Sequence, residues 1–264
     1  MILVLAGTSE ARMLIQHLAQ KNIPHQGTVV SEYGAVLLKS VKLKSVKEGE
    51  AGIHQGSLDE DGLTAYLKDQ GITLVVDATH PYAVQASQTA MAAAKKVGVP
   101  YLRWEREQEE IPRHPQIHEV DTLKEAACWF VPGQRVFSTL GSRQVGRLAQ
   151  LAGEKQAYLL ARVLPVRASL EACEAAGLRP EQIIAMKGPF SKALNRAMFA
   201  DTKAQLVLTK ESGEAGGFQE KIEVALELDM EVVVLRRPRL AYPQVLHTLE
   251  EVLAYIKKEG KDKI

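Results

Sequence analysis

The sequence predicts an α/β protein with two domains, each built on a parallel sheet. Short apolar, β-branched segments alternate with segments of helical period, a pattern typical of parallel strands covered by helices on both faces. Two strand candidates, "TLVVDA" and "EVVVLR", are continuously apolar, as strands buried on both faces require. A strand, a Gly/Ser/Thr turn and a helix open the chain and recur from residue 135. We therefore expect two Rossmann/flavodoxin-like domains with an interdomain cleft, where ligands usually bind.

Strand and helix candidates alternate along the whole chain. A polar stretch with two prolines, residues 105–120, is expected to cross between an N-terminal domain (1–120) and a C-terminal domain (121–264). The strand candidates are Ile2–Ala6, Gly27–Ser31, Leu74–Asp77, Tyr101–Trp104, Arg135–Ser138, Ala157–Ala161, Gln182–Ala185, Gln205–Leu208 and Glu231–Leu235. The helix candidates are a segment with Ala11, Leu14, Ile15 and Leu18 on one face, followed by Val84–Val97, Leu123–Phe130, Arg143–Leu151, Ser191–Phe199, Gly217–Leu228 and Gln244–Lys258.

Length, charge and cysteine content exclude several classes of protein. The chain of 264 residues is long enough for two domains with cores of their own. Lys plus Arg number 33 and Asp plus Glu number 32, a balance that argues against a nucleic-acid binder. Cys128 and Cys173 form no C-x-x-C pair, and Pro115 separates His114 from His118, so we expect neither a disulfide framework nor a metal site. Without a signal peptide or a long apolar segment, the protein is expected to be soluble and cytoplasmic.

The turn after the first strand is a candidate nucleotide site. Ligands of parallel α/β sheets bind beyond the carboxyl ends of the strands. There "AGTSEA" (6–11) offers Gly7 for close backbone approach, the hydroxyls of Thr8 and Ser9, and the N-terminus of a helix, which attracts phosphate. The dinucleotide signature G-x-G-x-x-G is absent, and a purely structural turn explains these residues equally well.

The turn "DATHPYA" (77–83) ends the strand Leu74–Asp77 and is a candidate for acid–base chemistry. It places Thr79 and His80 where a core strand stops, and Pro81 is suited to open the next helix. A histidine titrates near neutral pH, so His80 could bind an acidic substrate or donate a proton. The alternative is a capping threonine beside an ordinary loop histidine.

Three further loops carry hydroxyls and cations. "STLGSRQ" (138–144) is a second hydroxyl-rich turn, in which Arg143 can pair with a phosphate or carboxylate. "TKESGEAGG" (209–217) is rich in glycine and contains Lys210, but it is no Walker A loop. "MKGPFS" (186–191) adds Lys187 at another strand end. Together these loops indicate an anionic ligand and a nucleotide; a surface arginine and flexible loops are the alternative.

An ordered set of motifs runs from residue 5 to residue 238: "LAGTSEAR", "DATHPYA", "YLRWER", "STLGSRQ", "ARVLP", "MKGPFS" with Asn195 after it, "LVLTKESGEAGG" followed by "EKI", and "VVVLRRP". This set resembles the precorrin-6A reductase family of cobalamin biosynthesis, including cobalt-precorrin-6A reductases. Two positions depart from the family's pattern: Ala6 stands where a second glycine is common, and Val166 where a second proline is common. Neither departure removes a charged group.

The resemblance implies an oxidoreductase that transfers a hydride to a carbon–carbon double bond of precorrin-6A or its cobalt form, giving precorrin-6B. It favours NADPH as the cofactor, with NADH open because Ser31 and Glu32 are both present at the end of the second strand, where a carboxylate favours NAD and a serine favours NADP. A cofactor lying between the domains would account for the absent glycine signature. The implied catalytic residues are His80 and Lys210. The implied cofactor ligands are Gly7, Thr8, Ser9, Glu10, Thr79, Ser138, Gly141, Ser142, Arg143, Ser212 and Gly213, and the implied substrate ligands are Tyr82, Arg103, Arg162 and Lys187.

Two other function classes remain open. A two-domain nucleotide-sugar transferase also uses a cleft between α/β domains, although the sequence has no D-x-D motif. A non-catalytic tetrapyrrole- or nucleotide-binding module would need no hydride donor. The sequence leaves open the presence of cobalt in the substrate, the oligomeric state, and whether a side chain donates a proton.

Overall fold

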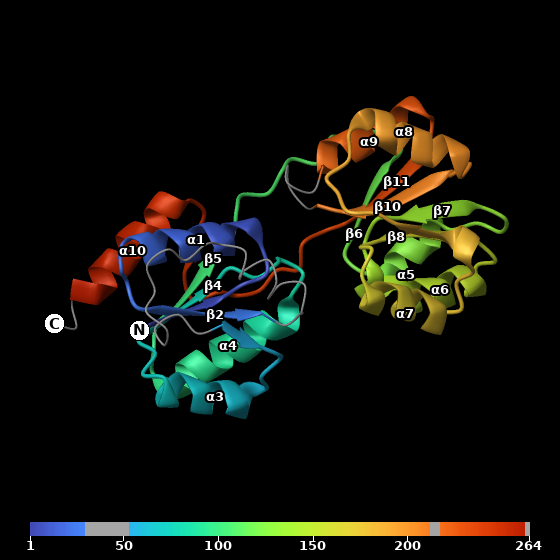
Figure 1. The fold of residues 1–264 in the computed structure, drawn as a ribbon. Helices are drawn as coiled ribbons and strands as arrows, with labels where there is room; N and C mark the ends of the chain where they lie inside the picture. The colour runs from blue at the N-terminus through green and yellow to red at the C-terminus, as the bar shows by residue number, and fades with distance from the viewer. Residues whose placement is uncertain (30–52, 212–216, 262–264) are drawn as a thin grey trace. The chain divides into compact units, whose positions relative to one another are not determined.

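The computed structural model describes residues 1–29, 53–211 and 217–261, and over these residues it confirms two α/β units built on parallel sheets (Figure 1). Unit 1 comprises Met1–Glu107 and Pro238–Ile264, and unit 2 comprises Gln108–Arg237. The expected domains 1–120 and 121–264 therefore need correction. The chain enters unit 2 earlier than expected, and it returns to unit 1 after residue 237.

The sheet of unit 1 has the strand order β12-β5-β4-β1-β2-β3, and all neighbours are parallel. Successive side chains of a strand point to opposite faces. Ile2 and Val4 accordingly pack with α1 and α10, while Leu3 and Leu5 pack with α3 and α4 (Figure 1). The strands are β1 (Ile2–Leu5), β2 (His25–Val29), β3 (Ile53–Gln55), β4 (Leu74–Asp77), β5 (Tyr101–Trp104) and β12 (Val245–Leu246); the helices are α1 (Ser9–Gln20), α3 (Glu60–Asp69), α4 (Val84–Val97) and α10 (Leu249–Lys261).

The sheet of unit 2 has the strand order β6-β11-β10-β7-β8-β9, again with parallel neighbours. One face packs on α8 and α9, where Phe137 and Val207 meet Phe218 in a single apolar cluster. Helices α5, α6 and α7 cover the other face (Figure 1). The strands are β6 (Ile117–Val120), β7 (Arg135–Ser138), β8 (Tyr158–Val163), β9 (Ile183–Ala185), β10 (Leu206–Lys210) and β11 (Glu231–Leu235); the helices are α5 (Leu123–Ala126), α6 (Val145–Glu154), α7 (Arg167–Ala175), α8 (Lys192–Asp201) and α9 (Phe218–Glu227), with short 3-10 turns η1 (Ala127–Trp129), η2 (Ser142–Gln144) and η3 (Pro180–Gln182).

The two sheets share one strand order, but the sixth strand of each is not where the chain order would place it. The strand that follows β5 in sequence joins the sheet of unit 2, and the last described strand of the chain joins the sheet of unit 1. Both follow the order 3-2-1-4-5-6 known from dinucleotide-binding folds. In unit 1 the sixth position, beside β5, is filled by β12 from the far end of the chain. In unit 2 the sixth position, beside β11, is filled by β6, which follows β5 in sequence. Residues 105–120, expected to be a linker, therefore end in a strand.

Several element boundaries are confirmed exactly, namely those of β4, β5, β7, β11 and α4. Strands β3, β6 and β12 and helices α3 and α7 have no counterpart among the predicted elements. The helix expected from Gln244 starts only at Leu249, because Val245 and Leu246 pair with β5. The end of the second strand candidate, with Ser31 and Glu32, lies outside the described residues.

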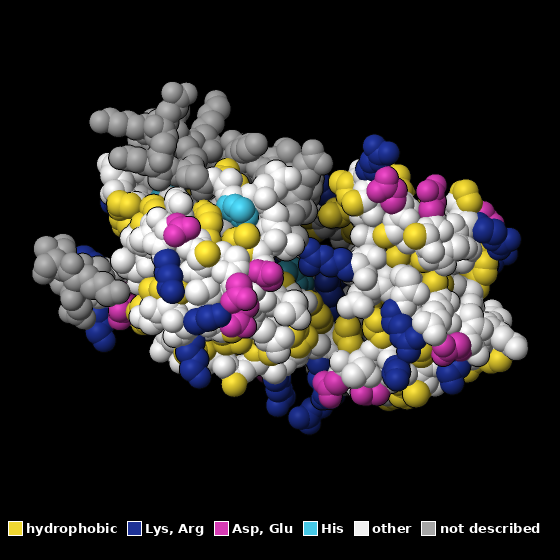
Figure 2. Space-filling view, turned by 90° about the horizontal axis from the view of Figure 1, so that it is seen from below, with side chains coloured by type: hydrophobic (Ala, Val, Ile, Leu, Met, Phe, Trp, Pro, Cys, Tyr) yellow, Lys and Arg dark blue, Asp and Glu magenta, His cyan; other side chains and the backbone are white. Residues whose placement is uncertain are grey.

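Three further observations concern the length and apolarity of the helices, the charge on the surface and the state of the cysteines. Within the described residues, none of the helices is both long and apolar enough to cross a membrane. Basic and acidic side chains are interspersed on the face in Figure 2. Both cysteines are free thiols, with Cys128 exposed and Cys173 buried.

Candidate functional site: the strand ends of both units

The turn after β1 lies beside the turn after β4 in unit 1. The strand order reverses between these two strands, which is where ligands of such sheets bind. Gly7 is exposed, and a Cβ added there would come no closer than 4.0 Å to the backbone of Thr79 and His80. Thr8 is the N-cap of α1: its Oγ1 accepts from the Ala11 N–H at 3.2 Å and donates to the Ala78 carbonyl at 2.8 Å. The Thr8 hydroxyl therefore already ties the two turns together.

The first turn of α1 also carries a carboxylate, Glu10, that pairs with an arginine outside the helix. Ser9 Oγ donates to Glu10 Oε2 at 3.1 Å, and Glu10 Oε1 lies 3.2 Å from Arg106 Nε. A carboxylate at a helix N-terminus is stabilised by the helix dipole, as a bound phosphate would be. Arg106 offsets the charge that Glu10 would otherwise present to an anion at this turn.

Asp77, at the end of β4, is the centre of a buried network. Its Oδ1 accepts from the Thr79 N–H (2.9 Å), the Thr79 hydroxyl (2.7 Å) and Arg103 Nη1 (2.9 Å). Its Oδ2 accepts from Ser87 Oγ (2.6 Å) and Tyr101 Oη (2.5 Å). Burial, followed by the charge of Asp77, raises the pKa of Tyr101 far above its usual range. This network shapes the turn that carries His80.

Arg103 belongs to this network rather than to the surface. Its side chain is fully buried, and Nε donates to Glu105 Oε2 at 2.8 Å. The Tyr242 ring lies beside its guanidinium, 5.3 Å from centroid to Cζ, and Nη2 has no hydrogen-bond partner among the described residues. The structure thus shows Arg103 holding the turn; a role as substrate ligand stays a prediction.

His80 and Tyr82 follow on the same turn and are partly exposed. The His80 Nδ1 lies 3.4 Å from the Tyr82 N–H, and the two rings are tilted with centroids 5.5 Å apart. The His80 carbonyl accepts from the Ala83 N–H at 2.8 Å and closes the turn before α4. Both side chains thus lie partly exposed on the turn after β4, and their roles in catalysis and substrate binding stay predictions.

The turns of unit 2 repeat this arrangement. Thr139, after β7, donates to Thr209 Oγ1 at 2.9 Å, so the ends of β7 and β10 are tied together as those of β1 and β4 are. Ser138 is buried and its Oγ accepts from the Leu140 N–H. Gly141 adopts φ +82°, a conformation that favours glycine, and Ser142 Oγ lies 3.0 Å from Ser169 Oγ. Arg143 in η2 is exposed.

Arg162, at the end of β8, is held from two sides. Its Nη1 donates to Asn195 Oδ1 at 2.8 Å, and its guanidinium lies 4.1 Å from the Phe190 ring centroid. The Asn195 Nδ2 in turn donates to the carbonyls of Phe190 and Ser191. Burial lowers the pKa of Arg162 to about 10. Asn195 is therefore a positioning residue that was quoted in a motif but given no role from the sequence.

Arg143, Arg162, Lys210 and Lys221 form what we call the cationic cluster. Burial, and then the charge of Arg143, lowers the pKa of Lys210 to about 8. Lys221 is 5% exposed; burial, then Arg162 and Lys210, lowers its pKa to about 7, against a smaller opposite effect of Glu220 and Glu109. Strongly shifted pKa values of this kind concentrate at functional sites.

Sequence reasoning missed Lys221. It lies on α9 among the buried residues Phe218, Ile222 and Ala225. A lysine on the apolar face of a predicted helix is the signal that could have identified it, since lysine is seldom fully buried without a reason.

The remaining predicted residues fall outside this arrangement. Lys187, two residues beyond β9, is exposed. Ser212 and Gly213 lie outside the described residues. The end of β10 is anchored by the buried ion pair of Glu211 with Arg237, whose Nη2 donates at 2.8 Å.

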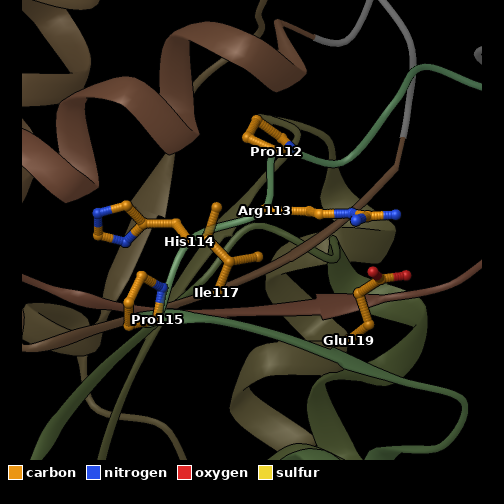
Figure 3. A pocket seen from close by; sticks show the side chains of 6 residues that line it. All are labelled: Pro112, Arg113, His114, Pro115, Ile117 and Glu119. Atoms are coloured by element: carbon orange, nitrogen blue, oxygen red, sulfur yellow. The ribbon is translucent and has the colours of Figure 1, made fainter.

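A pocket of unit 2 lies elsewhere, along β6 and the segment before it (Figure 3). Arg113 and Glu119 extend to one side of it and His114 to the other. His118 instead pairs with Glu231 at 2.5 Å and stacks on Trp129. None of the predicted site residues lines this pocket, which is lined by Pro112, Arg113, His114, Pro115, Ile117 and Glu119.

Known proteins resemble this chain over nearly its whole length. The family model described as "Precorrin-6x reductase CbiJ/CobK" matches residues 1–257. A cobalt-precorrin-6A reductase of Priestia megaterium is 33% identical over 255 residues, which cover 96% of each chain. A cobalt-precorrin-6A reductase of Methanocaldococcus jannaschii is 38% identical over 200 residues, 75% of this chain and 78% of the relative. The solved structure "CobK precorrin-6A reductase" superposes with a TM-score of 0.77 at 24% identity and covers 98% of this chain and 97% of its own, a likeness of fold.

Proposed function

Because the chain belongs to the precorrin-6x reductase CbiJ/CobK family of cobalamin biosynthesis, we propose that it reduces a carbon–carbon double bond of cobalt-precorrin-6A, with NADPH as the hydride donor. The two relatives described above, both named cobalt-precorrin-6A reductases, support the cobalt form as substrate. The family also implies a nicotinamide cofactor, and the resemblance of the strand-end motifs supports NADPH over NADH.

The cationic cluster is the observation that carries this proposal. A precorrin bears many acetate and propionate carboxylates, and an Arg or Lys beside each is the chemistry that recognises them. Arg162 and Lys210 stand at the ends of β8 and β10, the two strands on either side of β7, with Lys221 on α9 and Lys187 exposed beyond β9. We assign the substrate carboxylates to these residues, with Tyr82 and Arg103 of unit 1 as further candidates.

The turn after β1 in unit 1 and the turn after β7 in unit 2 each offer, taken separately, groups suited to a phosphate of a nicotinamide cofactor. Gly7 is exposed and leaves the backbone beside Thr79 and His80 open to close approach. Gly141, Ser142 and Arg143 combine a positive-φ turn, a hydroxyl and an exposed guanidinium. Thr8, Ser9, Glu10, Thr79 and Ser138 shape these turns through the hydrogen bonds described above, and Ser212 and Gly213 complete the proposed set.

A bound nicotinamide cofactor supplies the hydride, so the side chains act by binding and by charge. Lys210, whose pKa is about 8, carries substantial positive charge at neutral pH and can stabilise negative charge that develops on the ring. His80 is partly exposed at the end of β4 and can orient the ligand or donate a proton. Asn195 and Asp77 keep the arginines and the turns in place.

The decisive experiment follows NADPH oxidation with cobalt-precorrin-6A and precorrin-6A side by side, and repeats it with NADH. We expect turnover with NADPH and a higher kcat/KM for the cobalt form. Lack of oxidation of either cofactor with both substrates would overturn the proposal. Binding of a sugar nucleotide with transfer activity would favour the transferase instead, and tetrapyrrole binding without turnover would favour the binding module.

A glycine variant tests the cofactor turn. Because the nearest atoms to an added Cβ are 4.0 Å away, Gly7→Ala should leave the Tm unchanged and raise KM for NADPH several-fold by blocking close approach of a phosphate. Gly153→Ala, in helix α6 with open space at the Cβ, is the matched control and should leave KM unchanged. Equal KM values in both variants would remove Gly7 from the proposed site.

A further inference from the structure

The segment 188–191 lies against Arg162 at the end of β8. Strands β8 and β9 pair in parallel, with Arg162 opposite Ile184, so the segment that follows β9 begins beside the end of β8. Ser191 ends this segment as the N-cap of α8, where its hydroxyl accepts from the Leu194 N–H at 3.3 Å. The segment is thus fixed at both ends next to the arginine.

The ring of Phe190 contacts both Gly188 and Arg162. The Arg162 Cζ lies over this ring, 4.1 Å from its centroid, and the Phe137 ring is a more distant neighbour at 5.7 Å. A Cβ built on Gly188 would come within 2.9 Å of Phe190 Cε2 and 3.1 Å of Cδ2. Two carbon atoms prefer a separation of about 3.5–4.0 Å, so any side chain at position 188 would displace the ring.

Asn195 of α8 connects the arginine to the same segment. The Arg162 Nη1 donates to Asn195 Oδ1 at 2.8 Å, and Asn195 Nδ2 donates to the carbonyls of Phe190 at 3.2 Å and Ser191 at 3.1 Å. An amide oxygen orients a guanidinium without cancelling its positive charge, as a carboxylate would. Ring, backbone and amide together therefore fix the position of Arg162 and leave its charge in place.

We propose that Phe190, with Gly188 as its seat, is a positioning residue that orients Arg162 for a carboxylate of the substrate. The inference rests on the proposed function for the identity of the ligand, a tetrapyrrole polycarboxylate. Only 7% of Arg162 is exposed, so the orientation of its guanidinium decides which N–H groups a ligand can reach. A guanidinium oriented before the ligand arrives loses less conformational freedom on binding, which increases affinity.

The test measures the affinity of the whole protein for uroporphyrin I, a stable octacarboxylate tetrapyrrole, by absorbance titration. Phe190→Leu removes the ring and should raise Kd about five- to tenfold, as expected for one desolvated cation–π contact. Gly188→Ala should raise Kd by a similar factor, because its methyl group displaces the ring. Phe130→Leu, which shortens a buried side chain at the C-cap of η1, is the matched control and should keep the wild-type Kd.

A double variant separates an effect through the ring from a general disturbance of the segment. Leucine is shorter than phenylalanine, so the methyl group of Gly188→Ala has no ring to displace when Phe190→Leu is also present. The double variant should therefore bind uroporphyrin as Phe190→Leu does, which is a non-additive result. Effects on Kd that multiply would show that Gly188→Ala acts through the backbone, and would overturn the inference.

Stability and kinetics give readouts that a purely structural role would not change in the same way. Phe190→Leu and Phe130→Leu both remove apolar surface and should both lower the Tm, but Phe190→Leu alone should lose affinity. In NADPH oxidation, Phe190→Leu should raise KM for cobalt-precorrin-6A by more than it lowers kcat, with KM for NADPH unchanged. A lower Tm of Phe190→Leu together with a wild-type Kd would overturn the inference.

The outcomes separate this inference from the proposed function. Unchanged uroporphyrin affinity of both Phe190→Leu and Gly188→Ala would overturn the inference, as would failure of the wild type to bind uroporphyrin. Absence of NADPH oxidation with either precorrin would overturn the proposed function alone and leave the uroporphyrin affinities standing.

Discussion

At the scale of single residues, a charged side chain near a candidate binding loop can stabilise the conformation of the loop instead of contacting a ligand. Arg103 and Arg162 occupy similar strand-end positions in their sheets, and the sequence gives them the same role. In the structure Arg103 lies between the carboxylates of Asp77 and Glu105, whereas Arg162 has an amide partner, Asn195, and two aromatic rings beside it. The partners that distinguish them, Asp77 and Asn195, lie 26 and 33 positions away in sequence, so a local motif does not reveal them.

Replacing Arg103 tests its structural role. Arg103→Met leaves Asp77 buried without its cation, and loss of one partner of a buried ion pair costs about 3–5 kcal/mol. Urea unfolding should show this loss as a lower midpoint. The double variant Asp77→Asn with Arg103→Met should recover part of it, because no buried charge is then left alone. An Arg103→Met protein with unchanged stability and lost turnover would instead make Arg103 a substrate ligand.

At the scale of elements, apolar strands and long helices were predictable and their neighbours in space were not. The boundaries of β4, β5, β7, β11 and α4 follow from continuous burial or helical period. Strand β12 has only two residues, and its pairing with β5 joins segments over a hundred positions apart. The local hydrophobic pattern carries no information about a strand partner so distant in sequence. The residues of β12 were therefore predicted as the start of the last helix.

The cap of α1 shows how an element shapes the turn before it. Thr8→Ala removes both the hydrogen bond from the Ala11 N–H and the bond to the Ala78 carbonyl. Loss of an N-cap costs about 1 kcal/mol, and we expect the free energy of unfolding to fall by at least that amount. Thr8→Ser keeps the hydroxyl and should retain most of the stability. Equal stability of Thr8→Ala and the wild type would show that the hydroxyl is free for a ligand.

At the scale of the whole molecule, the exchanged strands decide which part of the chain is a self-contained unit. Residues 108–237 include all six strands of their sheet. Residues 1–107 lack β12 and α10, whose Val252 and Ile256 pack with Leu102 and Trp104. The two-domain organisation was predictable from the repeated strand–turn–helix pattern; the true division was not, since it depends on the exchange.

Separate expression tests this division. Residues 108–237 alone should unfold in one cooperative thermal transition followed by circular dichroism. Residues 1–107 alone should show no such transition, because part of their apolar face is uncovered, and adding residues 238–264 as a second chain should restore it. Cooperative unfolding of residues 1–107 without the added chain would contradict the dependence on β12 and α10.

The return of the chain to unit 1 also sets the order in which the two units can complete their sheets during synthesis. Unit 2 lies between β5 and β12 in the sequence, so the ribosome delivers all of it before residues 238–261. During that interval β5 exposes an open strand edge, and such edges recruit other chains. Synthesis at about 5–20 residues per second makes the interval on the order of ten seconds. Unit 1 is thus the first unit to be synthesised and the last to complete its sheet. It is the unit whose exposed strand edge a chaperone would need to cover.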